Sequence, residues 1–330
     1  MLPAAPNDTG VRVIPLADAD PFDLDALFEE QRLEWMERLR WDYSAPSKIL
    51  REVIRRRELL GYAAVVGSTT IGFSFYVLED TRCSIGDIYV SRDWRESGAD
   101  GKMVLDLLEA IRPLSRIRRI ECQGPAFDNS GADRVFRSFG FSAFERHFMI
   151  ASLSVADAQG HTESMVPPSN VSLEVELRPW DEKDFSAAAR VIYRSYKGSI
   201  DRDVNILYAT EEGCADLLSI LTDSIWCGKF LQDVSSVAVS GRPGNLVGLL
   251  IATSIAADVG HIGQISVAPG YQGRGVARGM MTAALSRLAA EGYSAASLVV
   301  TAENTRALDL YKGTGFRTIH SFPVYCRQQR

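Results

Sequence analysis

The sequence predicts an α/β fold with mixed sheets in which one unit of strands and helices occurs twice. Strand-like and helix-like patterns alternate along the 330 residues, a length that suits two domains. Short segments of the first half recur, in the same order, in the second half. In the second half a β-branched strand also passes through a Gly-rich turn into an apolar helix, an arrangement typical of anion-binding sites.

The individual elements follow from the spacing of apolar residues. Alternation, or short apolar runs bounded by Gly and Pro, predicts strands, and apolar residues three or four positions apart predict helices. We expect strands at 11–16, 62–66, 71–78, 84–90, 117–122, 141–153, 171–177, 229–239, 246–254, 260–267 and 297–301, with a last strand from 316. We expect helices at 21–39, 47–60, 101–114, 131–139, 181–196 and 211–221, with two more that begin at 275 and 304.

The repeat rests on two collinear matches. Residues 85–90 match 262–267, and downstream the two halves share a pattern of Asn, aromatic and Gly-Phe positions. The members of this second match are Asn129, Phe136, Gly140 and Phe141 in the first copy, and Asn304, Tyr311, Gly315 and Phe316 in the second. Chance similarity of short segments is the alternative, but two matches at nearly equal spacing favour a duplication.

Residues 156–170 separate the two copies. This segment contains Pro167 and Pro168 among Gly and polar residues, a composition typical of linkers. The sequence therefore predicts a first domain at 1–155 and a second domain at 171–330.

The Gly-rich turn of the second copy is the most specific feature of the chain. It reads Gln272-Gly273-Arg274-Gly275-Val276-Ala277. The first N–H groups of a helix have no partner inside it, and the helix dipole favours negative charge there. Gly273 and Gly275 allow the main chain to approach an anion, and Arg274 and Arg278 can add cationic contacts. The turn therefore predicts a phosphate-binding site.

Two common phosphate loops are excluded by the spacing. The turn lacks the Gly-Lys-Ser/Thr end of a nucleotide P-loop, and it is not the Gly-x-Gly-x-x-Gly loop of dinucleotide-binding folds. It resembles the Gln/Arg-x-x-Gly-x-Gly/Ala loop that binds the pyrophosphate of acetyl-CoA in the GNAT acetyltransferase superfamily. For the loop taken alone, an ordinary strand-to-helix turn is the alternative.

The second half of the GNAT signature follows downstream. Residues Asn304, Ala307, Tyr311, Gly315 and Phe316 form the pattern N-x-x-A-x-x-x-Y-x-x-x-G-F. With both motifs in the family's order, the resemblance implies two tandem GNAT folds, of which the second is intact. Tandem GNAT proteins of this size include mycothiol synthase-like enzymes, and the order of a degenerate first copy and an intact second copy resembles them.

The resemblance implies how acetyl-CoA is held. In GNAT folds two strands separate at a bulge, and the unpaired main-chain groups there bind the pantetheine arm like an added strand. The N–H group of Val267 is the expected donor to the thioester oxygen. The expected cofactor contacts are Ile265, Ser266, Val267, Gln272, Gly273, Arg274, Gly275, Val276, Ala277, Asn304 and Tyr311.

Tyr311 is the expected acid for the leaving thiolate. A phenol with a pKa of about 10 stays protonated at neutral pH and can protonate a thiolate whose pKa is about 8.5. A core Tyr with its hydroxyl at the rim is the alternative. Asn304 lies two turns earlier on the same helix face, where it can cap the helix and also reach the cofactor arm.

His261 is the candidate base. In the resemblance, histone-type and serotonin-type relatives place a Glu or His at this spacing before the loop. A His with a pKa of about 6.5 can accept a proton at neutral pH, directly or through a water molecule. The alternatives are a strand His that is hydrogen-bonded at the rim and a reaction that uses ordered water without a single base.

The first copy is expected not to catalyse. Its loop carries Glu96 and Asp100 where the second copy has Gly and Ala, and two carboxylates oppose a phosphate ligand. Phe136 stands where the second copy has its acid, and Ser84 stands where it has its candidate base. A role in packing and in shaping the acceptor cleft is expected instead.

Composition limits the partners and the compartment. The net charge of −6 and the pI near 5.4 argue against nucleic-acid binding. No apolar run is long enough to span a bilayer, and no secretory leader is recognisable. The five cysteines are odd in number and lack metal-ligand spacing, which favours reduced thiols in a cytoplasm and no metal site. We expect a monomer or homodimer without a membrane partner.

Together these features predict a cytoplasmic, acetyl-CoA-dependent N-acetyltransferase. Its second copy would move acetyl to the amine of a small molecule by direct attack in a ternary complex. A non-catalytic acyl-CoA sensor and a transferase of a longer acyl chain are the alternatives. The motifs describe the cofactor and leave the acceptor open. The acidic candidates for a cationic acceptor, most of which solvated surface charge also explains, are Asp201, Asp203, Glu211 and Glu212.

Overall fold

The computed structural model describes residues 10–124, 127–128, 130–154, 175–223, 226–241 and 244–329. The chain forms two compact units. The first unit comprises Met1–Met36, Tyr43–Glu145 and Phe322–Arg330, and the second comprises Glu37–Asp42 and Arg146–Ser321. The linker expected at 156–170, the first residues of the strand expected at 171–177, and Asn129 lie outside the described residues.

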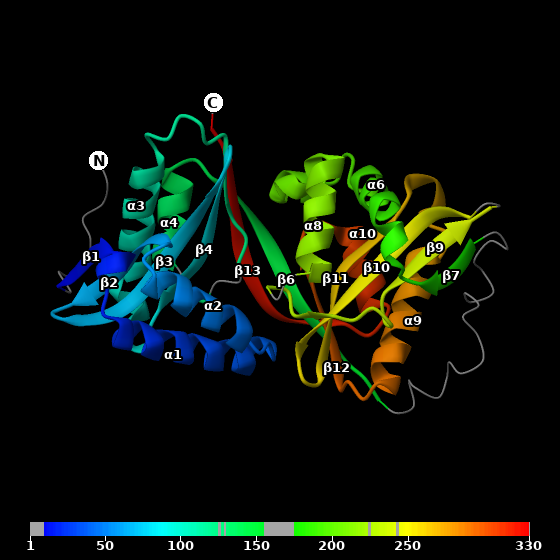
Figure 1. Ribbon diagram of the computed structural model, residues 1–330, viewed down its shortest axis with the longest axis horizontal. Helices are drawn as coiled ribbons and strands as arrows, with labels where there is room; N and C mark the ends of the chain where they lie inside the picture. The colour runs from blue at the N-terminus through cyan, green and yellow to red at the C-terminus, as the bar shows by residue number, and fades with distance from the viewer. Residues whose placement is uncertain are drawn as a thin grey trace. The chain divides into compact units, whose positions relative to one another are not determined.

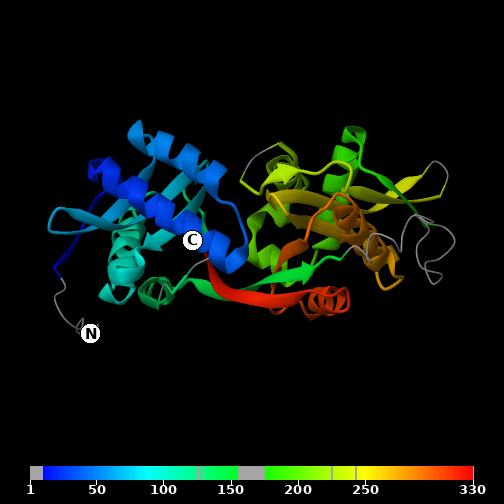
Figure 2. The ribbon, with the colours of Figure 1, turned by 90° about the horizontal axis from the view of Figure 1, so that it is seen from below.

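The first unit is a sheet covered by helices on both faces. Its strands run in the order β1-β2-β3-β4-β5-β13. Their bounds are β1 Val11–Pro15, β2 Leu60–Val66, β3 Thr69–Glu79, β4 Arg82–Val90, β5 Arg119–Cys122 and β13 Arg317–Gln328. The helices are α1 Pro21–Leu39, α2 Ser44–Arg55, α3 Ala99–Ile111 and α4 Ser130–Ser138. Figure 2 shows α1 and α2, in blue, on one face of this sheet, and α3 and α4 on the other.

The second unit repeats this plan (Figure 1). Its strands run in the order β6-β12-β11-β10-β9-β7, and β8 also pairs with β10. Their bounds are β6 Ser142–Ser152, β7 Val175–Pro179, β8 Lys229–Phe230, β9 Ser236–Ser240, β10 Asn245–Ala256, β11 Val259–Val267 and β12 Ala295–Thr301. The helices are α6 Phe185–Ser195, α7 Ile200–Val204, α8 Glu211–Asp223, α9 Val276–Ala290 and α10 Thr305–Lys312.

Each sheet contains one strand from the other sequence copy. Strand β6, the last of the first copy, pairs antiparallel with β12, where Ser152 faces Ala295 and Arg146 faces Thr301. Strand β13, the last of the second copy, pairs antiparallel with β5. The predicted domains at 1–155 and 171–330 follow the sequence repeat, whereas the compact units follow this pairing. The pairing joins segments that are distant in sequence, so no local pattern predicted it.

The sheet of the second unit opens beside β11. The antiparallel register with β10 shifts between the pairs Ile251–Gln264 and Ala252–Ile262, so that Gly263 forms a bulge. The parallel pairing of β11 with β12 stops at Ile262. The remainder of β11 therefore has no neighbour on that edge, and the separation of strands that the sequence implied is present.

Buried side chains form two cores in the second unit, one on each face of its sheet. Leu249 and Ile251 of β10 pack with α6 and α8, whereas Leu250 between them packs with α9. This alternation follows from the two-residue period of a strand. Met280 and Leu288 of α9 are fully buried in the second core, as their helical spacing predicted.

Some predicted bounds were wrong for local reasons. The helix expected at 47–60 ends at Arg55, and Arg57 adopts a left-handed conformation with φ of 57° that a helix cannot continue. The strand expected at 229–239 is interrupted, because the N–H of Ser235 donates to the carbonyl of Leu231 in a turn. The short helix α7 carries too little apolar pattern to be found in sequence.

Candidate functional site

A glycine cradle lies between β11 and α9. Gly273 and Gly275 have φ of +75° and +83°, a conformation that residues with a Cβ rarely adopt. The first helical bond runs from the N–H of Gly279 to the carbonyl of Gly275, at 2.9 Å. The N–H groups of Val276, Ala277 and Arg278 precede that bond and point out of the helix end. They form a set of donors for an anion.

The side chain of Gln272 braces this cradle. Its Nε2 donates to the carbonyl of Val267 at 2.9 Å, and its Oε1 accepts from Arg306 at 2.7 Å. Gln272 therefore ties the end of β11 to the start of α10. A Cβ at Gly273 would meet only the guanidinium of Arg306, 3.8 Å away, so the space above the loop is open.

A cavity of about 580 Å³ extends from the cradle along β11 to α10. It brings together most of the residues that the sequence predicted. These are Ile265, Ser266, Val267, Gln272, Gly273, Gly275, Val276, Ala277, Asn304 and Tyr311. Arg278, the cation singled out beside the loop, also lines the cavity.

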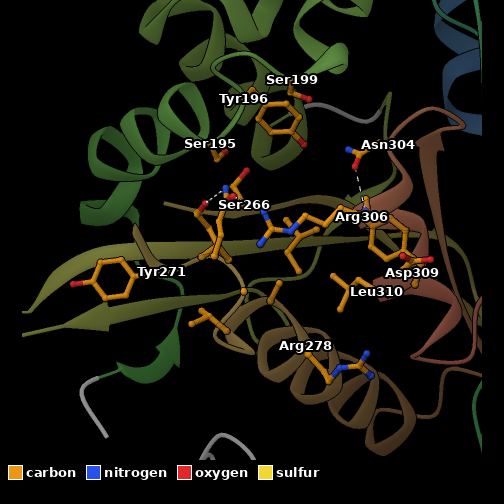
Figure 3. A pocket seen from close by; sticks show the side chains of 18 of the residues that line it. Ser195, Tyr196, Ser199, Ser266, Tyr271, Arg278, Asn304, Arg306, Asp309 and Leu310 are labelled. Atoms are coloured by element: carbon orange, nitrogen blue, oxygen red, sulfur yellow. Dashed lines mark hydrogen bonds between the residues drawn. The ribbon is translucent and has the colours of Figure 1, made fainter. Parts of the chain in front are cut away.

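One side of the cavity, formed by the end of α6 and the loop to α7, was not predicted from the sequence. Figure 3 shows Tyr196 and Ser199 there, across the cavity from Arg278 of α9. No motif marks this loop, and only its position between two amphipathic helices could have drawn attention to it. The missed lining residues are Ser195, Tyr196, Lys197, Gly198, Ser199, Tyr271, Arg306, Ala307, Asp309 and Leu310.

The main chain of β11 presents free groups to the cavity. The N–H of Ala268 donates to the carbonyl of Val247 at 2.8 Å, so alternation directs the N–H of Val267 away from β10. That direction is the edge where β12 has separated. Gln272 already donates to the carbonyl of Val267. The N–H of Val267 is therefore the main-chain group of this residue that can bind a ligand.

Tyr311 lies on the cavity side of α10. It is 8% exposed, and its ring packs edge-on against Phe316 at 6.1 Å between centroids. Burial raises the pKa of the phenol, and the negative charge of Asp201 adds to this effect. The group is therefore protonated throughout the neutral range.

Asn304 and Asp201 hold the start of α10. Asn304 caps the helix as predicted, because its Oδ1 accepts from the N–H of Ala307 at 3.1 Å, and its Nδ2 donates to Asp201 at 2.7 Å. Asp201 also accepts from the hydroxyls of Thr301 at 2.5 Å and Ser199 at 3.1 Å. This buried carboxylate accepts three hydrogen bonds from the protein, and its contact with a cationic acceptor stays a prediction.

Gln264 organises a polar network beside the cavity. The buried amide donates to the hydroxyl of Tyr196 at 3.1 Å and to that of Ser266 at 2.8 Å, and it accepts from Tyr208 at 3.1 Å. The rings of Tyr196 and Tyr208 stack at 3.9 Å. Burial raises the pKa of Tyr196 to about 12, so its hydroxyl stays protonated.

His261 does not line the cavity. It is 6% exposed, its Nδ1 lies 2.9 Å from the hydroxyl of Ser297, and its ring lies 5.3 Å from that of Trp41. Burial, followed by the charge of Arg146, lowers its pKa to about 4. Trp41 lies far from His261 in the sequence, so no local pattern predicted that His261 would be buried.

Arg274 also lies outside the cavity. Its guanidinium stands over the ring of Tyr271, 5.5 Å from the centroid. Arg278 donates to the carbonyl of Gly313 at 2.9 Å. Neither cation is therefore fixed on the cradle by the protein alone.

The described residues contain no group of three or more potential metal ligands and no helix long and apolar enough to cross a membrane. All five cysteines are free thiols.

Comparisons with known proteins cover the part of the chain that forms this cavity. The sequence pattern of the acetyltransferase (GNAT) family matches residues 210–316, which include β11, the cradle and α10. A mycothiol acetyltransferase of Renibacterium salmoninarum is 25% identical over 250 residues, which cover 72% of this chain and 67% of that protein. A mycothiol acetyltransferase of Streptomyces scabiei is 33% identical over 94 residues, 28% of this chain and 30% of that protein.

Solved structures share the fold over the whole chain. A GCN5-related N-acetyltransferase from Sphaerobacter thermophilus matches with a TM-score of 0.62 and 17% identity, and covers 97% of this chain and 96% of its own. A tandem GNAT protein from the clavulanic acid biosynthesis pathway matches with a TM-score of 0.59 and 13% identity, over 96% and 98% of the two chains. Residues 210–316 thus match the acetyltransferase (GNAT) family, the whole chain has a tandem GNAT fold, and both findings support an acetyl-CoA-dependent N-acetyltransferase.

Proposed function

We propose that the second unit transfers an acetyl group from acetyl-CoA to the amine of a small molecule by direct attack in a ternary complex. The observation that carries this proposal is that the cradle, the free edge of β11 and Tyr311 border one cavity. Acetyl-CoA supplies the activated acetyl group. The residues of the chain bind it, orient it and manage the protons.

The cradle suits the diphosphate of the cofactor. The N–H groups of Val276, Ala277 and Arg278 converge at the positive end of the α9 dipole, and no Cβ of Gly273 or Gly275 stands in the way. Arg306 and Arg278 line the same space and can pair with phosphate oxygens.

The N–H of Val267 stabilises the charge that develops on the thioester oxygen. It points to the open edge of β11, where the pantetheine arm can add as a strand. A donor already held by the sheet needs no reorganisation during the reaction, and removal of one such donor typically costs roughly 100-fold in rate.

Tyr311 donates the proton that the leaving thiolate requires. Its raised pKa keeps the phenol protonated, and its place on the cavity wall is compatible with contact to the sulfur. The assignment of His261 as the base stays a prediction. Its contacts with Ser297 and Trp41 support a structural use of this side chain, and water in the cavity can instead accept the proton of the amine.

The acceptor is a small molecule, by analogy with the relatives named mycothiol acetyltransferase. We assign the reaction to the second copy, 171–330, and a supporting role without catalysis to the first copy, 1–155. A cytoplasmic location is compatible with the five free thiols.

Release of the free thiol of CoA tests the proposal. A panel of small amines is offered with acetyl-CoA to the wild-type protein and to Tyr311→Phe, and thiol is measured. We expect acceptor-dependent release that falls in the variant. Tight binding of acetyl-CoA without release from any amine would support the sensor instead, and turnover only with longer thioesters would support the long-chain transferase.

A further inference from the structure

The exchange of β6 brings a residue of the first sequence copy to the reaction side of the second unit. Arg146 of β6 lies opposite Thr301 of β12, and opposite residues of paired strands share a face. Thr301 donates to Asp201, which holds Asn304 at the cavity. Two residues along β6, Phe148 packs near the rings of Trp41 and His261, on that same face.

The charge of Arg146 is not balanced by the protein. Its Nε atom is buried without a hydrogen-bond partner, and its guanidinium pairs with no carboxylate of the described part of the chain. The nearby carboxylate of Asp201 is already engaged by Thr301, Asn304 and Ser199. A buried donor without a partner is costly, and a ligand that supplies an acceptor removes that cost.

Arg146 does not itself line the cavity, but Asp201, which accepts from Thr301 opposite Arg146, also accepts from Asn304 of the cavity wall. Burial is the largest influence on the pKa of four groups near Arg146. The positive charge of Arg146 acts in addition and lowers the pKa of each of these groups. These are His261, Tyr196, Tyr208 and Tyr311. Two of them, Tyr196 and Tyr311, line the cavity.

The same side of the cavity also offers hydroxyl donors. Gln264 gives its amide hydrogens to the oxygens of Tyr196 and Ser266. The hydroxyl of Ser266 therefore accepts one bond and keeps its own hydrogen for another acceptor, and the hydroxyl of Tyr196 also hydrogen-bonds with Tyr208. Hydroxyl donors and an unbalanced guanidinium together match an anionic oxygen group, and a planar carboxylate fits a guanidinium in two-point contact.

We propose that Arg146 binds a carboxylate carried by the acceptor, so that the acceptor class is small amino acids and their derivatives. This inference rests on the proposed transfer to an amine. It also gives the first sequence copy a direct part in acceptor binding, because the specificity residue lies on its last strand.

Matched pairs of amines test the proposal. Glycine, β-alanine and 4-aminobutyrate are each compared with the corresponding carboxamide, and kcat/KM is measured for wild type, Arg146→Gln and Arg146→Lys. The surface variant Arg317→Gln is the control. The difference in basicity between the two amines of a pair does not affect the comparison between proteins, because the same two amines are used with each protein. We expect wild type to prefer a carboxylate, Arg146→Gln to lose that preference by roughly 30-fold, and Arg146→Lys to retain part of it.

A binding measurement keeps the inference separate from turnover. The N-acetylated form of each carboxylate and of each carboxamide is titrated by calorimetry into protein saturated with CoA. We expect Arg146→Gln to weaken the carboxylates about 30-fold and the carboxamides little, while Arg317→Gln behaves as wild type.

Two results would overturn the inference. One is an equal carboxylate preference, in binding and in kcat/KM, in wild type and Arg146→Gln. The other is a rise of the acetyl-CoA KM in Arg146→Gln that accounts for its whole loss of activity. A protein that binds the carboxylates through Arg146 but acetylates no amine would retain the inferred anion site and contradict the proposed reaction.

Discussion

The two glycine turns of the chain share a left-handed glycine before a helix and differ in what surrounds it. Gly98 before α3 and Gly275 before α9 have φ of +75° and +83°. In the first unit the parallel pairing of β4 with β5 also stops early, at Ile85, next to a register shift against β3. The main chain of the first copy therefore retains the glycine before the helix and the open edge, but not the second left-handed residue of the loop.

In the first unit, charged side chains pair with one another around this turn. Arg95, at the position of Gln272, pairs with the buried Glu34 of α1 and with Asp128 at 2.8 Å. The hydroxyl of Tyr89 lies 3.1 Å from Glu30 and 3.2 Å from Glu34. Acidic side chains of α1 thus occupy the place where an anionic ligand would have to bind.

Asp100 acts differently from the expectation. Its buried carboxylate accepts from the N–H of Ala132 at the start of α4, at 2.8 Å, and so fixes one helix to another. Glu96 is exposed, and the hydroxyl of Ser97 accepts from the N–H of Ala99 at 3.3 Å. We infer that a glycine turn can bind an anion only when its N–H donors and the nearby positive charges are not already paired with protein carboxylates.

The largest effect is expected when the second cradle receives the side chains of the first. Gly273→Glu combined with Ala277→Asp adds two carboxylates and a side chain at a left-handed position. We expect acetyl-CoA binding to weaken at least about 1000-fold, by like-charge repulsion and backbone strain. The reverse pair in the first copy, Glu96→Gly with Asp100→Ala, is the control and should leave the calorimetric Kd unchanged. An unaltered Kd in the first variant would contradict the cradle assignment.

Tyr311→Phe copies Phe136 of the first unit into the second. The phenol hydroxyl is lost while the ring can still pack against Phe316. We expect kcat to fall roughly 100-fold with little change in the KM for acetyl-CoA, because the proton donor acts in the transition state. Tyr271→Phe, at another Tyr of the cavity wall, is the matched control. A rise in KM with an intact kcat would assign Tyr311 to binding alone.

His261 should make stability depend on pH. Its pKa falls from an ordinary value of 6.5 to about 4 in the folded chain, chiefly through burial. Below about pH 6.5 the imidazole of His261 is protonated in the unfolded chain but not yet in the folded chain. The contribution of His261 to the free energy of unfolding is therefore fully present above that pH and is lost as the pH falls toward 4. The loss is on the order of 3 kcal/mol. Urea unfolding of wild type and His261→Gln checks this, and the variant should show a flatter profile.

The same variant addresses the predicted base. His261→Gln with an unchanged rate across about pH 6 to 9 would remove His261 from the reaction, whereas a rate that falls across that range and no longer declines toward low pH would support its role as the base.

The smallest effect is expected from Glu34→Gln in the first unit. The amide retains the shape and part of the hydrogen bonding but loses the charge that faces Arg95. We expect the free energy of unfolding to fall by about 2 kcal/mol while the acetyl-CoA KM stays the same. Glu52→Gln, on the exposed face of α2, is the control. A change in the KM for acetyl-CoA would show that the first unit shapes the cofactor site.

Local patterns predicted the parts of the site that depend on local conformation. The cradle needs left-handed glycines, the cap of α10 needs an Asn before the helix, and Tyr311 follows at helical spacing, so all three are readable in sequence. Contacts between distant segments were not readable. Trp41 over His261, Gln264 against Tyr196, and the transfer of β6 to the other sheet depend on packing that no short pattern encodes.

Calorimetric titration of acetyl-CoA into the full chain tests the central claim most directly. We predict one equivalent bound per chain, and we expect Gly273→Glu combined with Ala277→Asp to abolish that binding. Two equivalents per chain, or one equivalent that survives in that variant, would place the cofactor in the first unit and contradict the account.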